Sequence, residues 1–574
     1  MEIELLDDLP LIGNQLQEFD LDKLFNQIFP DHGLWKGISG GKLAVGWLMY
    51  ILSEGDHKLS HVEDWAALRI KTLGAILGEP ALRHEDFSDD RLGRLLDRYS
   101  KDSDWELFEQ EIGSTMLQVY PLMSCSSYSP TELKVIRTDC FNAPQYRKPA
   151  ELLTHGYSKQ RRKDQPFCKV VMSCIEPSII PLVVEIVPGS ENDVLTYLPN
   201  IERARKMLDS CGNLYVGDSK LGSLSNRTQI QRNKDFYLCP LGRKQCTEEK
   251  LQEHLDALIL PIEELPSLFT EKESKRGSAY FYELEEQMQS DDGSEQWIER
   301  RILIYSPNHA RQVISSLTNR ISEAETSIQN LVISKKGRRN PKTLSELQIR
   351  IASLLKKYNV VEFFEIECSQ TITSREVQRH KNRAKETRES ITLHLSITRK
   401  EEQITKKRKR LGWQVYASNA PKDHIESSEL VRCYRDEYRI EHLFDFMLNR
   451  DVGILPIYLQ QEHRIKALIR LLSVGMKFIM LLQYRVREAV ATRDKPLKEL
   501  YPGNKSRSTN MPTTPMLLRA FKGIGVAFLN STEQGIQMTT LKDIQKEILE
   551  LLGIPNVYQQ VLKVLKTPPD LHET

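Results

Sequence analysis

Three carboxylate residues have the types and positions that metal-dependent phosphoryl transfer requires. Asp139 and Asp218 stand at the ends of two short β-prone runs, and Glu441 lies on a long helical stretch much later in the chain. Ligands of α/β proteins usually bind at the carboxyl ends of strands. Carboxylates that converge there suit the hard cations Mg²⁺ or Mn²⁺. Two such ions, about 3.5–4 Å apart, can clamp the attacking and leaving oxygens of an in-line displacement.

Each of these residues also has an ordinary structural explanation. An Asp at a strand end is more often a turn or cap residue than a ligand, and a Glu on a helix is usually solvated or ion-paired. Spacing alone does not separate the three from the other carboxylates of the chain. Their order does, because it follows a framework of Asp-strand, Asp-strand, insertion, strand and Glu-helix.

The elements that would position these residues form an α/β pattern. KVIRTDCF (134–141) is a β-prone run, and residues 167–193 hold two apolar, β-branched runs around a Glu-Pro-Ser turn, which predicts a hairpin. A helical stretch follows, then the strand NLYVGD (213–218), a second helix and the strand DFYLCPLG (235–242). Three strands, a helix, a strand, a helix and a strand predict a core with a mixed sheet.

Changes in the expected secondary structure along the chain predict five regions. A later strand, GWQVYASNAP (412–421), and a helix over 427–450 indicate that the core resumes after an interruption. The predicted regions are a helical, DNA-binding domain over 1–115, the first part of the core over 116–242, an insertion over 243–411, the second part of the core over 412–500 and a C-terminal helical region over 501–574. For 1–115, an ordinary helical domain without DNA contact is the alternative.

Composition excludes several classes of protein. The 574 residues are 40% hydrophobic and 28% charged with a formal net charge of +1, which fits neither a disordered chain nor a uniformly basic nucleic-acid coat protein. The nine cysteines include no Cys-x-x-Cys pair, so we expect a reduced, intracellular protein without zinc. The N-terminus lacks the pattern of a signal peptide. The apolar run Ile465–Val486 contains Lys466, Arg470 and Lys477, which predicts a buried helix rather than a membrane span.

Basic stretches are the candidate DNA contacts. HGYSKQRRKDQ (155–165), with Lys159, Arg161 and Arg162, lies between the first two core strands, and further basic runs stand at 334–339 and 406–410. Charge runs are usually solvated surface, but three of them around a phosphoryl-transfer site favour contact with a phosphodiester backbone. Trp413 is either a stacking residue for a displaced base or a core aromatic, and the core is the better prediction.

The sequence resembles the bacterial insertion-sequence transposases that carry an Asp-Asp-Glu triad on an RNase H-like core. It is similar to the group with a large insertion before the Glu and a Tyr-x2-Arg-x3-Glu-x6-Lys signature. The similarity extends from about residue 85 to 560. The matching segments are FSDDRLGRLLDRY, RTDCF, HGYSKQRRKD, PLVVEIVPGSENDV, YVGDSKLGS, GWQVYASNAP, YRDEYRIEHLF, IKALIRLL, MPTTPMLL and LLGIP.

This resemblance implies that Asp139, Asp218 and Glu441 are the metal-binding triad, with Mg²⁺ as the cofactor and Mn²⁺ as a substitute. It implies an RNase H-like mixed-sheet core, interrupted by a mixed, largely β insertion subdomain and preceded by helices. At the signature, Tyr434 occupies the Tyr position, but Glu437 replaces the Arg and Leu448 the Lys. Arg439 and Arg450 are the candidates for the missing positive charge, and with Tyr434 they are predicted DNA contacts.

The function implied is a DNA transposase that binds the ends of its own element, cleaves them and joins them to target DNA. Its implied partners are double-stranded DNA and a second copy of the chain in the DNA complex. Its implied location is the nucleoid of a prokaryotic cytoplasm, with no membrane contact. Two alternatives stay open: a catalytically decayed or repurposed DNA-binding protein, favoured by the altered signature, and an RNase H-like nuclease without strand transfer.

Overall fold

The computed structural model describes residues 2–121, 133–156, 165–268, 279–333, 340–377, 386–449, 453–529 and 535–567. The chain divides into two compact units. Unit 1 consists of residues 1–240, 287–299 and 417–574, and unit 2 consists of residues 241–286 and 300–416.

The core of unit 1 is a mixed sheet. Its strands are β2 (Val135–Pro144), β3 (Phe167–Ile175), β4 (Ile180–Pro188), β5 (Leu214–Gly217) and β6 (Phe236–Pro240). They lie in the order β4-β3-β2-β5-β6. Three further strands of the chain are β7 (Tyr280–Gln289), β8 (Gln296–Tyr305) and β11 (Trp413–Ser418). β2, β3 and β4 pair antiparallel, whereas β5 runs parallel to β2 and β6 parallel to β5. This order and these directions are those of an RNase H-like core, so the predicted fold class is confirmed.

Helices cover both faces of this sheet. All nine residues of β3 are buried, as expected for a strand with packing on both sides. α8 (Asp193–Leu208) packs on β2, β3 and β4, and α16 (Glu462–Arg493) packs on β4. α8 begins after Asn192, whose side chain accepts a hydrogen bond from the Val194 N–H. α9 (Leu224–Arg232) connects β5 to β6, and Ser223 caps it in the same way.

The helix predicted over 427–450 is two helices. α14 spans Ser427–Arg435 and α15 spans Tyr438–Asn449, with Asp436 and Glu437 between them. The single-helix prediction is therefore wrong. Asp is a poor helix former because its short side chain competes for local hydrogen bonds, and here the Asp436 carboxylate lies 2.8 Å from the Arg439 guanidinium. The break at Asp436 and Glu437 makes α15 a helix separate from α14.

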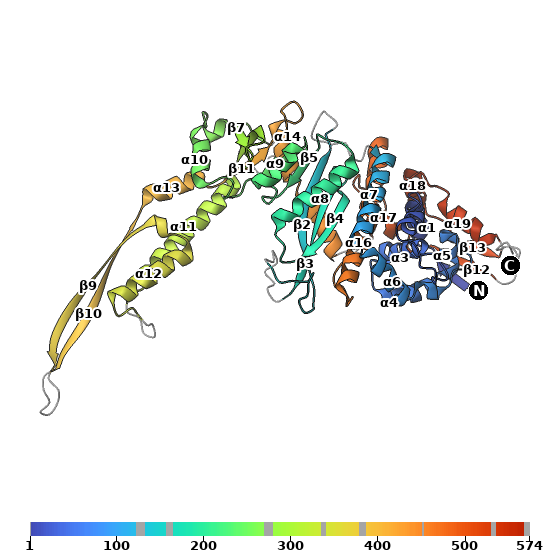
Figure 1. The fold of residues 1–574 in the computed structure, drawn as a ribbon, viewed down its shortest axis with the longest axis horizontal. Coiled ribbons are helices and arrows are strands. Elements are labelled where there is room, and N and C mark those ends of the chain that lie inside the picture. Colours follow the sequence, from blue (N-terminus) through green and yellow to red (C-terminus); the bar gives the residue numbers. More distant parts are fainter. Residues whose placement is uncertain are drawn as a thin grey trace. The chain divides into compact units, whose positions relative to one another are not determined.

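The two ends of the chain build one helical part of unit 1 (Figure 1). β1 (Glu2–Leu5) pairs antiparallel with β12 (Gly525–Phe528), which pairs with β13 (Ile536–Met538). The helices are α1 (Leu9–Gln17), α2 (Leu21–Ile28), α3 (Gly40–Glu54), α4 (Leu59–Ala67), α5 (Ile70–Leu77), α6 (Asp89–Tyr99), α7 (Asp102–Val119), α17 (Thr514–Ala520), α18 (Asp543–Leu551) and α19 (Val557–Lys566). The N-terminal helices thus share their core with the C-terminal ones.

The apolar run Ile465–Val486 is a buried helix, as predicted. It lies inside α16, where Lys477 is fully buried and donates hydrogen bonds to the carbonyls of Pro181 and Leu182 on β4. Arg470 donates to the carbonyls of Tyr99 and Ser100. These charged side chains bond to buried backbone oxygens instead of facing lipid. In the part of the chain that the structure describes, no helix has the length and apolar character needed to cross a membrane.

Unit 2 combines helices with a long two-stranded ribbon. Its helices are α10 (Glu248–Asp256), α11 (Pro307–Gln329), α12 (Leu344–Tyr358) and α13 (Glu401–Arg410), and its ribbon pairs β9 (Phe364–Val377) with β10 (Glu386–Arg399) antiparallel (Figure 1). One of its apolar cores contains Leu265, Leu303, Trp413 and Val415, and the Trp413 ring lies 5.0 Å from that of Tyr305. Trp413 is therefore a core residue, as predicted.

Candidate functional site: carboxylates at neighbouring positions of parallel strands

Asp139 on β2 and Asp218 directly after β5 occupy neighbouring positions in the sheet. β2 and β5 are neighbouring parallel strands, and Thr138 is the register partner of Gly217. Asp139 is the next residue of β2. Because β2 continues to Pro144, Asp139 lies within the strand and not at its end, so that prediction is wrong, whereas Asp218 directly follows β5 as predicted. Because neighbouring strands lie roughly 4.8 Å apart, the paired register brings the two Asp residues together from positions distant in sequence.

Hydrogen bonds hold both carboxylates in place. Oδ1 of Asp139 accepts from the Cys140 N–H at 2.7 Å, and the residue is only 8% exposed. Oδ1 of Asp218 accepts from the Tyr197 hydroxyl at 3.0 Å and from the Lys220 N–H at 2.8 Å. Burial raises the pKa of the Tyr197 phenol well above its usual range, and the charges of Asp139 and Asp218 raise it further. The Tyr197 phenol therefore stays protonated beside both carboxylates and can donate its hydrogen bond to Asp218.

Helix α15 brings Glu441 over the face of the sheet to which Asp139 points. Asp139 and Phe141 are two positions apart on β2 and so share a face. The Phe141 ring lies 4.7 Å from that of Phe444, which stands three residues after Glu441 and hence on a neighbouring part of the helix surface. The aromatic contact therefore places the predicted third carboxylate on the same side of the sheet as the first. Glu441 itself is exposed.

Glu437 is a fourth carboxylate at this site, and it was not among the residues predicted for the site. Burial raises the pKa of its carboxyl group, a hydrogen bond with Tyr434 opposes that rise, and the charges of Glu441 and Asp218 add to it. Glu437 thus lies within electrostatic reach of two of the predicted ligands. The spacing could have indicated this, because Glu437 stands four residues before Glu441 and so on nearly the same face of the helix predicted over 427–450.

The donor chemistry of this site suits a hard divalent cation, but its ligands are not gathered as a finished metal site. Asp139, Asp218, Glu437 and Glu441 offer only carboxylate oxygens, which Mg²⁺ and Mn²⁺ prefer. Within the residues that the structure describes, no three or more His, Cys, Asp and Glu side chains are grouped so that they could hold a metal ion. Carboxylates repel one another when no cation lies between them, which favours such an open arrangement.

A network of charges connects the strand of Asp139 to the helix of Glu441. Glu176, at the end of β3, is fully buried, and it pairs with Arg137 on one side and with Arg439 at 3.0 Å on the other. Arg137 stands two residues before Asp139, and Arg439 stands two residues before Glu441. Glu176 therefore fixes the two supporting elements relative to each other.

The predicted DNA contacts have different outcomes. The Arg439 side chain is 30% exposed and is paired with Glu176 and Asp436, so a structural role is visible for it. Tyr434 is half-buried and bonds to Glu437. Lys159, Arg161, Arg162 and Arg450 lie outside the described residues, as does the basic run 334–339.

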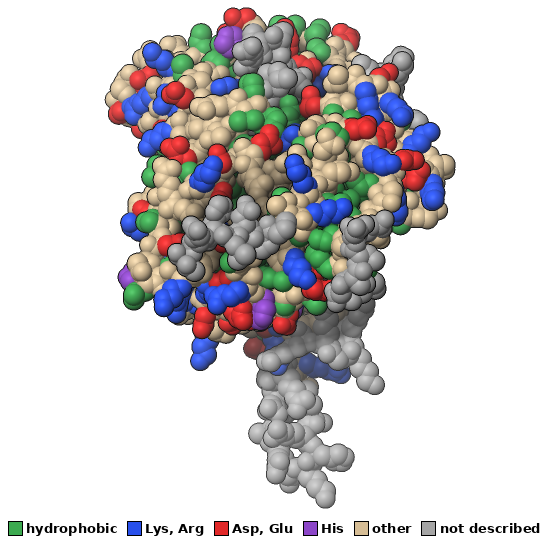
Figure 2. Space-filling view, turned by 90° about the vertical axis from the view of Figure 1, so that its right-hand side faces the viewer, with side chains coloured by type: hydrophobic (Ala, Val, Ile, Leu, Met, Phe, Trp, Pro, Cys, Tyr) green, Lys and Arg blue, Asp and Glu red, His purple; other side chains and the backbone are tan. Residues whose placement is uncertain are grey.

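Two further basic regions are partly neutralised. The basic run 406–410 on α13 is partly paired with a carboxylate. Lys407 pairs with Glu248, and the Arg410 guanidinium lies 3.2 Å from the same carboxylate. Figure 2 shows the face that carries the terminal helices, where Lys and Arg side chains are interspersed with Asp and Glu. That mixture matches an ordinary helical surface as well as a DNA-binding one, so the prediction for residues 1–115 stays a prediction.

Comparisons with known proteins add little about function. Residues 1–112 match a family described as a domain of unknown function, DUF4277. No curated protein matches the chain in sequence. Among solved structures, the chain is similar to a piggyBac transposase in a synaptic complex with hairpin DNA, determined by cryo-EM. The identity is 8% and the TM-score 0.34, with 99% of this chain and 87% of the other covered. A likeness this distant carries no argument.

Proposed function

We propose that this chain is a DNA transposase whose catalytic carboxylates are Asp139, Asp218 and Glu441. The observation that supports the proposal is the neighbouring position of Asp139, within β2, and Asp218, directly after the adjacent parallel strand β5, with the Glu441 helix over the same face. The resemblance of ten ordered segments to insertion-sequence transposases supports the same assignment. The substrates would be the ends of the element and a target duplex, bound by a pair of chains.

The proposed cofactor is Mg²⁺, held by the three carboxylates, with Mn²⁺ as a substitute. When bound, the ion would neutralise phosphate charge and activate the attacking oxygen of an in-line displacement. Asp139, Asp218 and Glu441 are the residues that would hold the ion, and their carboxylate oxygens are the ligands that such a cation prefers.

The chain's own residues would orient the reacting groups. Tyr197 and the Lys220 N–H hold Asp218, and the Cys140 N–H holds Asp139, so neither carboxylate is free to rotate. Glu176 pairs with both Arg137 on β2 and Arg439 on α15, and it thereby fixes the backbone that carries Glu441 relative to the strand. Such fixed positioning is the main protein contribution to phosphoryl transfer, which needs little acid–base chemistry.

The alternative is a DNA-binding protein that has lost catalysis. The altered signature favours it, because Glu437 stands at the Arg position and Leu448 at the Lys position. It predicts binding of element ends without cleavage.

The test is cleavage of a labelled duplex that carries the ends flanking the gene, with Mg²⁺ or with EDTA. We expect Mg²⁺-dependent nicking by the wild type and its loss in Asp139→Asn, Asp218→Asn and Glu441→Gln, while each variant still binds the ends. Glu429→Gln on α14 is the matched control, since its carboxylate pairs with Arg432 at 3.0 Å outside the site. Binding without nicking in the wild type would establish the alternative. Full strand transfer by Asp139→Asn would refute the assignment.

A further inference from the structure

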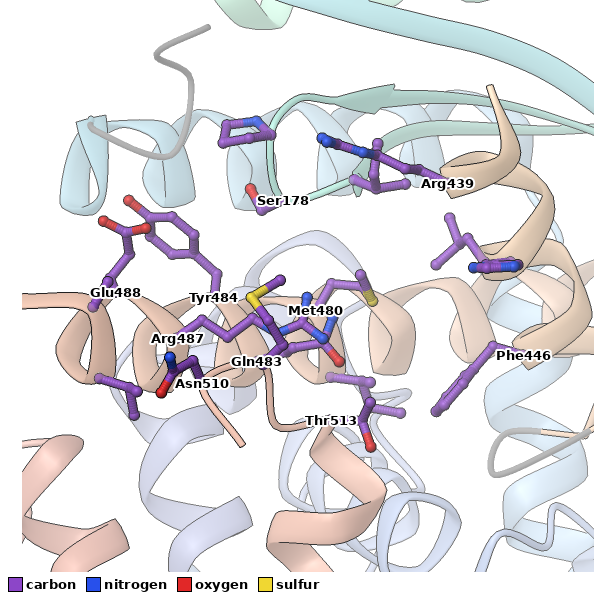
Figure 3. Close-up of a pocket in the computed structure, with 18 of the residues that line it drawn as sticks. Ser178, Arg439, Phe446, Met480, Gln483, Tyr484, Arg487, Glu488, Asn510 and Thr513 are labelled. Carbon is purple, nitrogen blue, oxygen red and sulfur yellow. The ribbon is translucent and has the colours of Figure 1, made fainter. Parts of the chain in front are cut away.

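A cavity of about 830 Å³ lies behind the helix of Glu441. Its walls are α15, the carboxyl-terminal half of α16, the turn between β3 and β4 and the segment 510–513, all in unit 1. Figure 3 shows Met480, Gln483 and Arg487 at its centre, with Ser178 and Arg439 on the opposite wall. This volume is large enough for a ligand of several hundred daltons.

The cavity is separate from the carboxylate site because α15 presents different faces to the two. Tyr438, His442 and Phe446 line the cavity at four-residue intervals, which places them on one face of the helix. Glu441 lies on another face of the helix, about 100° around the axis from His442, and Glu437 precedes the helix; neither residue lines the cavity. The helix that carries the third catalytic carboxylate is thus also a wall of the cavity.

Arg487 supplies the cavity with a positive charge. Its Nε donates to the carbonyl of Pro512 at 2.9 Å, and among the described residues no carboxylate forms an ion pair with it. Burial lowers the pKa of this guanidinium to about 10, and the nearby charge of Arg439 lowers it further. A half-buried guanidinium with two unused nitrogens is suited to receive the oxygens of a phosphate.

Neutral groups beside Arg487 suit a planar heterocycle. Gln483 stands one helical turn before Arg487, and within the described part of the chain neither its side-chain amide nor that of Asn510 has a hydrogen-bond partner. Such amides pair with the donor and acceptor edge of a nucleobase. Tyr484 and Met480 lie beside them and offer an aromatic ring and a polarisable thioether for stacking.

The charges of the lining limit the ligand to one phosphate. Glu488 and Asp494 also line the cavity, and Arg439 is already paired with Glu176 and Asp436. The two carboxylates would repel a run of sugar-phosphate backbone, whereas one phosphate can lie on Arg487 away from them. In Figure 3, Glu488 lies beside Tyr484 at one end.

We propose that this cavity binds a single nucleotide unit, with its phosphate on Arg487 and its base between Tyr484 and Met480, read by Gln483. The nucleotide comes either from a free mononucleotide or from an unpaired nucleotide at a DNA strand end. The second source rests on the proposed function, and the first does not.

The test is calorimetric titration of the full-length protein with deoxyadenosine monophosphate, deoxyadenosine and inorganic phosphate. We expect the mononucleotide to bind at least about tenfold more tightly than either part alone, since a charge-assisted hydrogen bond and a stacked base each contribute that factor or more. Arg487→Gln should weaken the mononucleotide at least about tenfold and leave deoxyadenosine unchanged. Gln483→Leu should weaken both.

Lys498→Gln is the matched control, because it removes one positive charge from an exposed position outside the cavity. Failure of the mononucleotide to bind, or equal binding by Arg487→Gln and wild type, would overturn the proposal. Asp218→Asn should bind the mononucleotide normally while losing cleavage, so the proposed function and the cavity can fail separately. Duplexes with and without an unpaired terminal nucleotide then distinguish the two sources, since only the former should lose affinity in Arg487→Gln.

Discussion

Replacing Glu176 by Gln should destabilise the protein more than any exposed charge substitution. Glu176 is fully buried, and its partner Arg137 is only 2% exposed. The change keeps the shape of the side chain but removes the negative charge that Glu176 presents to the buried Arg137 guanidinium. Removing one partner of a buried pair costs about 3–5 kcal/mol. The Arg439 side chain is 30% exposed, so losing its pair adds at most about 1 kcal/mol.

The assay is urea unfolding followed by far-ultraviolet circular dichroism and by tryptophan fluorescence, at low and high salt. We expect Glu176→Gln to lower the unfolding free energy of the transition that includes the sheet by about 3–5 kcal/mol. Arg439→Gln should cost about 1 kcal/mol or less, because water already reaches that side chain. The control is Glu429→Gln, whose partner Arg432 is exposed, with an expected loss of about 0–1 kcal/mol.

The salt dependence separates the causes. Buried pairs are screened little by salt, whereas exposed pairs are screened strongly. The loss in Glu176→Gln should therefore persist at high salt. A loss below about 1 kcal/mol, or one that vanishes at high salt, would refute the reasoning that Glu176 fixes the strand of Asp139 to the helix of Glu441.

Two further predictions concern stability. Burial raises the pKa of Asp8 from 3.8 to about 6, so between these pH values the folded protein binds more protons than the unfolded chain and stability falls as pH rises, by up to about 3 kcal/mol. Urea unfolding at pH 4 and pH 7 should show this fall in wild type and not in Asp8→Asn; equal pH dependence would contradict the assignment. Trp413→Ala should cost about 3–5 kcal/mol in thermal or urea unfolding while end-DNA affinity, measured by fluorescence anisotropy, stays unchanged; a selective loss of affinity would instead support a stacking role.

The sequence predicted the core strands well because local signals defined them. β2, β3 and β4 are apolar and β-branched, and the residues after them include turn formers, so the order of strands and helices could be read along the chain. The sequence placed Asp139 at a strand end because polar residues follow it, but β2 continues to Pro144, and the register that brings Asp139 beside Asp218 is visible only in the structure. That order of strands and helices predicted an α/β core with a mixed sheet, whereas the RNase H-like class was implied only by the resemblance to insertion-sequence transposases.

Non-local contacts were beyond sequence patterns. The pairing of β1 with β12 connects segments from the two ends of the chain, and the residue pattern of neither strand indicates which strand it pairs with. The break at Asp436 was missed because the residues on both sides of it have helical spacing, so the pattern continues across it. The role of Glu176 was missed because a single Glu in a hairpin turn gives no sign that Arg137 and Arg439 will meet it.

The most direct test of the central claim is to locate a bound cation. Crystals of the wild-type protein grown with Mn²⁺, and anomalous scattering measured at the manganese absorption edge, would show where the ion lies. The account predicts a peak coordinated by Asp139 and Asp218, with Glu441 turned toward it, and no such peak in Asp218→Asn. A wild-type structure with Mn²⁺ elsewhere, or with Asp139 and Asp218 bound to no ion at saturating Mn²⁺, would contradict it.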